Sequence, residues 1–186
     1  MEVVEMSDIW FTSDTHFNAQ RTLDLSKRPF NDLNEMNSTL VNNWNNVVGK
    51  NDIVFHLGDF GDYRFREFLN GEIILVKGNY ERYYKEEFEK YKDYFKDYYE
   101  MTYSICIPKT DSVYILNMSH EPHIIKNFKL NENNFNLFGH VHKLCMIKPY
   151  GLNVGTDCHN FTPINLETVK YYHGGIMNYF DDDVFY

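Results

Sequence analysis

The sequence lacks the features that mark several protein classes. It holds three cysteines among 186 residues and no Cys-x-x-Cys pair, which argues against a disulfide framework and favours free thiols in a reducing compartment. No apolar run is long enough to cross a membrane. The N-terminus has neither the basic stretch nor the apolar run of a secretory signal. We therefore expect a cytoplasmic protein without a membrane partner.

Positive charge is also scarce. Lys and Arg total 18 against 27 Asp and Glu, which gives a formal net charge of −9 at pH 7. Duplex nucleic acid needs a basic face on its partner, and no cluster of Lys or Arg stands out, so we expect no duplex partner. Bound metal ions would still let an acidic protein hold a small phosphate ester. The many Asn, Lys, Tyr, Phe and Ile residues are typical of an AT-rich genome, such as that of a phage or a low-GC bacterium.

The first half of the chain alternates strand and helix patterns. Hydrophobic residues make up 43% of the chain, which is enough for a sizeable core. Short apolar runs predict buried strands at residues 9–12, 52–57 and 72–77. Helical spacing predicts helices at 34–46, with Asp32 or Asn31 as N-cap, at 63–70 and at 81–99. This alternation predicts an α/β fold, with a parallel or mixed sheet and helices outside it.

The second half is richer in short strands. Segments 103–107 and 113–117 flank a turn-like sequence at 108–111 and predict a hairpin. Further strands are predicted at 135–138, 144–147 and 152–154, and a last helix at 166–172. Because no repeat or linker divides the sequence, we predict one domain over residues 1–186.

Residues that bind divalent metals recur just after the predicted strands. They stand in the segments Asp14-Thr15-His16, Gly58-Asp59, Gly78-Asn79, Ser119-His120 and Gly139-His140-Val141-His142. In α/β sheets, ligands collect at the carboxyl ends of the strands, so these side chains are expected to converge. Carboxylate, amide and imidazole ligands together suit Mn, Fe, Zn and similar ions better than Ca or Mg. Chance placement of eight histidines is the alternative, and the number and order of the segments argue against it.

In this order the segments resemble the calcineurin-like metallophosphoesterase superfamily, especially its small bacterial and phage members. The resemblance extends from residues 10–17 to residues 153–157 and includes Arg28-Pro29-Phe30 and residues 54–60. It implies an α/β/β/α sandwich, in which two packed mixed β-sheets are flanked by helices. It also implies metal-dependent hydrolysis of a small phosphodiester or phosphomonoester, such as a nucleotide or cyclic nucleotide.

The resemblance implies a centre of two divalent ions, with Mn, Fe, Zn and Ni as the candidate metals. One ion would be held by Asp14, His16, Asp59 and His142, and the other by Asp59, Asn79, His120 and His140. Asp59 would bridge the two ions. In such centres two ions roughly 3.5–4 Å apart clamp the phosphate and share a hydroxide that attacks phosphorus.

The chain departs from the family after Gly78-Asn79. Tyr80 stands where members usually have a catalytic histidine, and Asp62 matches the place of that histidine's acidic partner in some members. A phenol is a weak acid at pH 7, and general acid catalysis is typically worth about 10²–10⁴ in rate. We therefore expect weak activity on esters with poor leaving groups. His123 and His159 are candidate replacement acids, with ordinary loop histidines as the alternative.

Arg28 is a candidate for gripping the substrate phosphate, because a guanidinium group matches phosphate geometry. The alternative is a surface arginine or a fold-stabilising ion pair.

Two other functions compete with a phosphoesterase. The first is a catalytically degenerate member that keeps its metals and binds a phosphorylated ligand or a protein. Tyr80 favours this hypothesis, and the retention of all seven metal ligands argues against it. The second is a nuclease for short single strands, which would require a basic groove.

Overall fold

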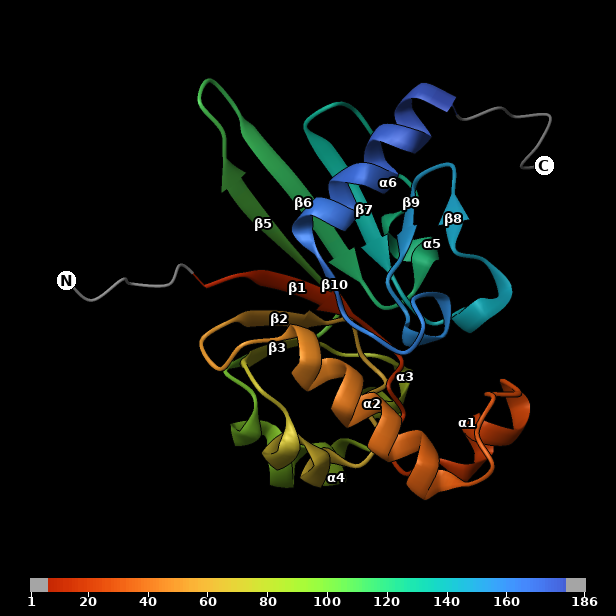
Figure 1. Cartoon of the computed structure of the whole chain (residues 1–186). Coiled ribbons are helices and arrows are strands. Elements are labelled where there is room, and N and C mark those ends of the chain that lie inside the picture. The colour runs from red at the N-terminus through yellow and green to blue at the C-terminus, as the bar shows by residue number, and fades with distance from the viewer. Residues whose placement is uncertain (1–6, 180–186) are drawn as a thin grey trace.

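Two five-stranded mixed sheets form the centre of the molecule (Figure 1). The structure is a computed structural model, and it describes residues 7–179. The strand order of the first sheet is β10-β1-β2-β3-β4. Its members are β1 (Ile9–Thr12), β2 (Ile53–His56), β3 (Glu72–Val76), β4 (Asp97–Tyr99) and β10 (Ile164–Asn165). Strands β1 to β4 are parallel, and β10 runs antiparallel to β1.

The second sheet has the order β5-β6-β7-β9-β8. Its members are β5 (Thr102–Pro108), β6 (Val113–Ser119), β7 (Asn134–Phe138), β8 (Ile147–Lys148) and β9 (Gly151–Asn153). The predicted hairpin is present as β5 and β6, and β6, β7 and β9 are parallel to one another. The α/β fold of two mixed sheets with flanking helices is thus confirmed.

The helices connect and cover the strands. The α-helices are α1 (Gln20–Leu25), α2 (Leu33–Val47), α3 (Asn79–Tyr83), α4 (Lys85–Tyr91), α5 (Pro122–Ile125) and α6 (Leu166–Tyr179). Short 3₁₀ helices are η1 (Tyr63–Phe68), η2 (Lys92–Tyr94), η3 (His142–Leu144) and η4 (Thr156–Cys158). Between residues 7 and 179, no helix has both the length and the apolar character needed to span a bilayer.

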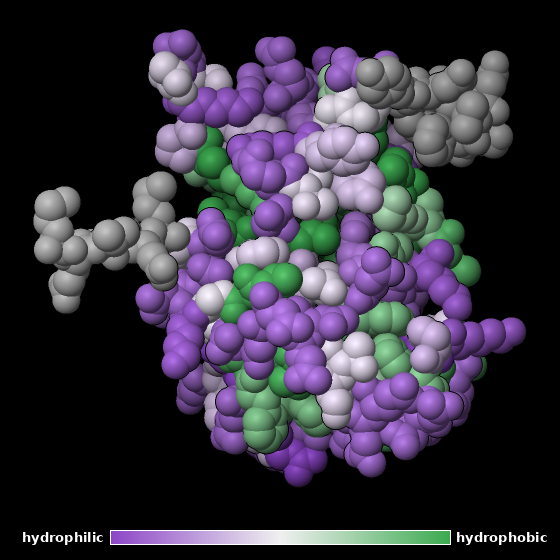
Figure 2. Space-filling model, viewed as in Figure 1, coloured by the Kyte–Doolittle hydropathy of each residue, from purple (hydrophilic) through white to green (hydrophobic). Residues whose placement is uncertain are grey.

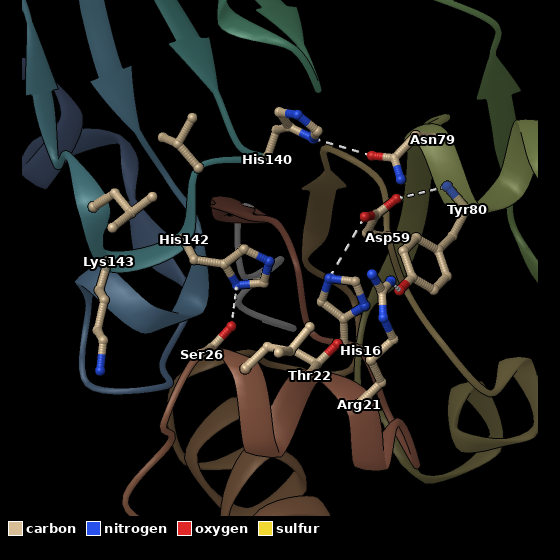
Figure 3. A pocket seen from close by; sticks show the side chains of 13 residues that line it. His16, Arg21, Thr22, Ser26, Asp59, Asn79, Tyr80, His140, His142 and Lys143 are labelled. Carbon is tan, nitrogen blue, oxygen red and sulfur yellow. Dashed lines mark hydrogen bonds and ion pairs between the residues drawn. The ribbon is translucent and has the colours of Figure 1, made fainter.

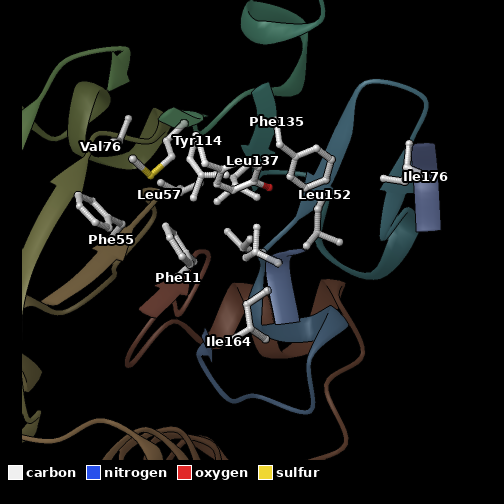
Figure 4. Close-up of a cluster of buried hydrophobic side chains, with 14 residues drawn as sticks. Phe11, Phe55, Leu57, Val76, Tyr114, Phe135, Leu137, Leu152, Ile164 and Ile176 are labelled. Atoms are coloured by element: carbon white, nitrogen blue, oxygen red, sulfur yellow. The ribbon is translucent and has the colours of Figure 1, made fainter. Parts of the chain in front are cut away.

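Alternating side chains of the first sheet serve two separate cores, because successive residues of a strand point to opposite faces. Phe11, Phe55 and Val76 point toward the second sheet and join its buried side chains (Figure 4). On the other face, Val54 and Ile73 pack with buried residues of α2 and α4. Both faces of β1 to β3 are therefore buried, as their apolar runs predicted.

Helix α2 forms much of the outer layer over the first sheet. It buries Met36, Leu40 and Trp44, and the side chain of Asp32 accepts a hydrogen bond from the Glu35 N–H at 2.8 Å. Asp32, one of the two predicted caps, is thus the N-cap. Hydrophilic side chains cover most of the face over these helices (Figure 2), which fits an amphipathic layer in contact with water.

The prediction of one helix over 81–99 was wrong. Helix α3 ends at Tyr83, Tyr84 has φ −103° and ψ 49°, and α4 and η2 follow before the chain becomes strand β4. Pairing with another strand determines the conformation of this segment. Strand β4 forms backbone hydrogen bonds with the free edge of β3, and Phe95 packs in the same core as Phe88. The strand predicted at 144–147 was wrong in part, because Leu144 ends η3 and β8 begins at Ile147.

Replacing Asp32 by Ala should lower the free energy of unfolding by about 1 kcal/mol, because the Glu35 N–H loses its acceptor. Urea denaturation would measure this loss. Asp32→Asn keeps an acceptor oxygen and is the matched control. An equal loss in both variants would contradict the assigned cap.

Candidate metal centre

The parallel strands bring the predicted ligands to one edge of the molecule. Asp14, Asp59 and Asn79 follow β1, β2 and β3, whose carboxyl ends lie together because these strands are parallel. Strands β6 and β7 end just before His120 and Gly139. All seven predicted ligands meet there through mutual contacts: Asp14, His16, Asp59, Asn79, His120, His140 and His142.

The Asp59 carboxylate lies between the side chains of Asn79 and His16 (Figure 3). Its Oδ2 is 3.5 Å from Nε2 of His16 and 3.6 Å from Nε2 of His120. Imidazole nitrogens from both predicted ligand sets therefore lie near the same carboxylate oxygen.

Three atoms that could bind a metal lie close together on the His120 side of Asp59. The Asn79 Oδ1 lies 3.0 Å from both His120 Nε2 and His140 Nδ1, and these two nitrogens are 3.1 Å apart. On the other side, the rings of His16 and His142 stack with centroids 5.1 Å apart, near the Asp14 carboxylate. Asp14 itself accepts from the backbone N–H of His140 at 2.9 Å.

Buried polar atoms without partners indicate that cations fit this set. Both ring nitrogens of His16 are buried and have no hydrogen-bond partner among the described residues. Such groups are costly unless something pairs with them. Carboxylate, amide and imidazole donors within a few ångströms suit divalent transition metals. The residues present therefore fit the metal ions that the fold implies.

The electrostatics of the centre lead to the same conclusion. Burial raises the pKa of the Asp59 carboxyl to about 7, and the nearby Glu81 and Asp14 carboxylates add to this rise. Burial also holds the pKa of His16 well below its usual value. For His120, burial acts in the same direction, but Asp14 and Asp59 outweigh it and raise the pKa. A divalent cation would stabilise the ionised form of such a buried carboxylate.

Five of the seven predicted ligands adopt left-handed backbone conformations. Their φ angles are 57° for Asp14, 48° for His16, 56° for Asp59, 71° for His140 and 48° for His142. Residues with a Cβ rarely adopt these angles, and such strain persists only where the surrounding structure imposes it. Other groups must therefore hold the ligand loops in place.

Glu81 holds the loops that follow β2 and β3. Its carboxylate is fully buried and accepts hydrogen bonds from the backbone N–H groups of Asp59 (2.8 Å), Phe60 (2.9 Å) and Gly78 (2.8 Å). The loops also touch closely at Gly58, whose φ is 86° and where a Cβ would lie 2.2 Å from the Gly78 nitrogen. Glycine is required at that contact.

Arg28 performs the same task for the Asp14 loop. Its buried guanidinium donates to the carbonyl oxygens of Asp14 (2.6 Å) and Thr15 (2.8 Å) and to both carboxylate oxygens of Asp157. The structure thus shows Arg28 in the fold-stabilising ion pair, with its side chain fully covered and no face open to a substrate phosphate. Asp157 also contacts Nδ1 of His142 at 2.9 Å. Burial opposes ionisation of Asp157, but these partners lower its pKa to about 2.

A pocket of about 440 Å³ opens over the ligands. Helix α1 supplies Arg21 and Leu25 to its lining, and η3 supplies Lys143 and Leu144. Tyr80 also lines the pocket, and its hydroxyl accepts a hydrogen bond from Arg21 (Figure 3).

The other predicted catalytic residues lie outside this pocket. Asp62 caps η1, pairs with Arg64 and borders a separate hollow beside α2. His123 is exposed on α5, and His159 Nε2 lies within hydrogen-bond distance, 2.7 Å, of the carbonyl oxygen of Asn153. None of the three lines the pocket, so the structure does not bring them to the ligands.

Three side chains that contact the candidate centre or its pocket were missed from the sequence. Glu81 had a local signal, because Gly78-x-x-Glu81 has the spacing of a helix-capping box. Asp157 and Arg21 had none, because their partners stand 15 or more residues away in sequence.

A family model described as calcineurin-like phosphoesterase matches residues 7–135. The chain belongs to this family. The match includes five of the predicted ligands, and His140 and His142 lie beyond it. Membership makes phosphoester hydrolysis the general type of activity, and divalent metals are general in the family.

Two relatives and one solved structure are similar to the chain. The uncharacterized protein MJ1445 of Methanocaldococcus jannaschii is 30% identical over 89% of this chain and 91% of its own length. The Gene 66 protein of Mycobacterium phage L5 is 43% identical over 29% of this chain and 26% of its own length. The crystal structure of AQ665, a protein of unknown function from Aquifex aeolicus, has a TM-score of 0.70 at 23% identity, covering 90% of this chain and 100% of that one. The last similarity shows the fold alone.

Replacing Glu81 by Gln should lower the free energy of unfolding by about 2–4 kcal/mol, because the amide keeps one acceptor oxygen and turns an NH2 donor toward at least one of the three buried N–H groups. Chemical denaturation of the metal-free protein would measure it. Glu87→Gln is the matched control, since Glu87 is an exposed helix residue paired with Lys90, and its loss should stay below about 0.5 kcal/mol. Equal losses would show that Glu81 does not hold the loops.

Proposed function

We propose that the chain is a metal-dependent phosphoesterase with a dinuclear centre. One ion is assigned to Asp14, His16, Asp59 and His142, and the other to Asp59, Asn79, His120 and His140. The observation that carries the proposal is the position of the Asp59 carboxylate, within 3.6 Å of an imidazole nitrogen from each set. Mn, Fe, Zn and Ni remain the candidate metals.

The residues of the chain would divide the catalytic work. Divalent ions, when bound, polarise phosphoryl oxygens and lower the pKa of water toward about 7. Glu81 and Arg28 fix the ligand loops before substrate arrives, so the ligands need little reorganisation during the reaction. The Asp157 carboxylate orients His142 through Nδ1, which leaves Nε2 of that ring as its free donor atom.

The pocket supports a small phosphate compound as substrate. Its volume of about 440 Å³ falls in the range of small-molecule sites. The net charge of −9 disfavours long nucleic acid, and two cationic side chains, Arg21 and Lys143, line the pocket. A nucleotide-sized phosphate ester suits these dimensions and charges.

A catalytically degenerate binding module is the second candidate, and Tyr80 is the observation that favours it. Tyr80 lines the pocket at the place of the usual histidine. Such a module would bind metal and phosphate without turnover, so an assay of hydrolysis separates the two candidates.

Asp59→Asn should reduce hydrolysis of bis-p-nitrophenyl phosphate with added Mn to background, because the variant loses the charge shared by both ligand sets. Metal content measured on the same sample should also fall. Asp24→Asn, which changes an exposed carboxylate on α1, is the control and should keep wild-type turnover. Unchanged turnover in Asp59→Asn would refute the assigned centre.

Tyr80→His should raise the rate on alkyl phosphodiesters, whose leaving groups need a proton, by about 10²-fold or more. The rate of hydrolysis of aryl esters should rise far less, since their leaving groups depart more easily. Comparing the two substrate classes in wild type and variant measures this difference. Hydrolysis of neither class by either protein would favour the binding module.

A further inference from the structure

Arg21 differs from every other arginine of the chain. There are five arginines, and Arg28 and Arg64 pair with aspartates, Arg82 pairs with Glu121, and Arg66 donates to two backbone carbonyls. Arg21 forms no ion pair within residues 7–179, although acidic residues outnumber basic ones in the sequence. Its side chain is exposed and lines the pocket over the metal ligands. An unpaired guanidinium beside a phosphate site is a natural anion-binding group.

Tyr80 sets how far Arg21 lies from the ligands. The Tyr80 ring meets the His16 ring edge-on with centroids 5.0 Å apart, and its backbone N–H donates to Asp59 at 2.9 Å. Arg21 Nη1 then donates to the Tyr80 hydroxyl at 3.0 Å. The Tyr80 side chain and one hydrogen bond thus separate the guanidinium from the predicted ligands. Arg21 is therefore better placed to contact a substrate phosphate next to the scissile one than to contact the scissile phosphate itself.

We propose that Arg21, held by Tyr80, binds a second phosphate, and that the favoured substrates are phosphoanhydrides. The inference rests on the proposed phosphoesterase function. The Tyr80 hydroxyl accepts from Arg21, so its own hydrogen remains available to donate to the same anion. Guanidinium and phosphate match in charge and in planar donor geometry.

The reaction of a phosphoanhydride fits a site without a histidine after Asn79. The oxygen of water forms a bond to one phosphorus, and the bond from that phosphorus to the bridging oxygen breaks. The electron pair stays on the bridging oxygen, which leaves as part of a phosphate. One proton of the water passes to solvent, and the other stays on the oxygen that is now bound to phosphorus. A phosphate with a pKa near 6 departs at neutral pH without a proton from the enzyme. Arg21 would balance the charge that this group carries away.

The test compares wild type with Arg21→Ala on two substrate classes in the presence of Mn. ADP and ADP-ribose are the phosphoanhydrides, and bis-p-nitrophenyl phosphate is the ester that has no second phosphate. Arg21→Ala should lower kcat/KM for the anhydrides about 10–100-fold and change that of the ester less than about threefold. Arg21→Lys should recover part of the loss. Calorimetric affinity for α,β-methylene-ADP should fall by a similar factor in Arg21→Ala.

Arg64→Ala is the matched control, because Arg64 is an exposed arginine that lies outside this pocket. It should leave both substrate classes within about twofold of wild type. If wild type cleaves the ester but neither anhydride, or if Arg21→Ala loses both classes equally, the inference fails while the phosphoesterase stands. If wild type cleaves none of the three compounds, the proposed function fails and the inference fails with it.

Discussion

The buried carboxylate of Glu81 is the constraint on which the rest of the centre depends. Three backbone N–H groups from two loops point at it, and those loops carry Asp59 and Asn79. A buried charge is stable only when its hydrogen bonds are complete, so both loops are fixed relative to each other. Arg28 supplies the opposite charge on the other side of the centre and fixes the loop that carries Asp14.

The hydrogen bonds of Glu81 and Arg28 explain how the chain folds despite groups that destabilise the folded state. Left-handed backbone at five ligands and carboxylates in close proximity both oppose folding. The two sheets and their cores stabilise the fold, and the hydrogen bonds of the buried Glu81 and Arg28 side chains hold the loops in their strained conformations. A site fixed in advance in this way is ready to receive cations with little rearrangement, which is what binding and catalysis require.

Much of the fold and the convergence of the candidate ligands could be predicted from the sequence because the signals are local. Apolar runs identified β1, β2 and β3, and polar residues at their ends identified Asp14, Asp59 and Asn79. The failures concern contacts between distant residues. Residues 97–99 form a strand because β3 offers a free edge, and Arg28 is covered because Asp157, 129 positions away, pairs with it. No local pattern encodes such partners.

The central claim is that preorganised loops bring two ligand sets together at one carboxylate. Anomalous diffraction from a crystal grown with Mn tests it most directly. The account predicts two ions per chain, both in contact with the Asp59 carboxylate and separated by roughly 3.5–4 Å. A single ion, or two ions of which neither touches Asp59, would contradict it.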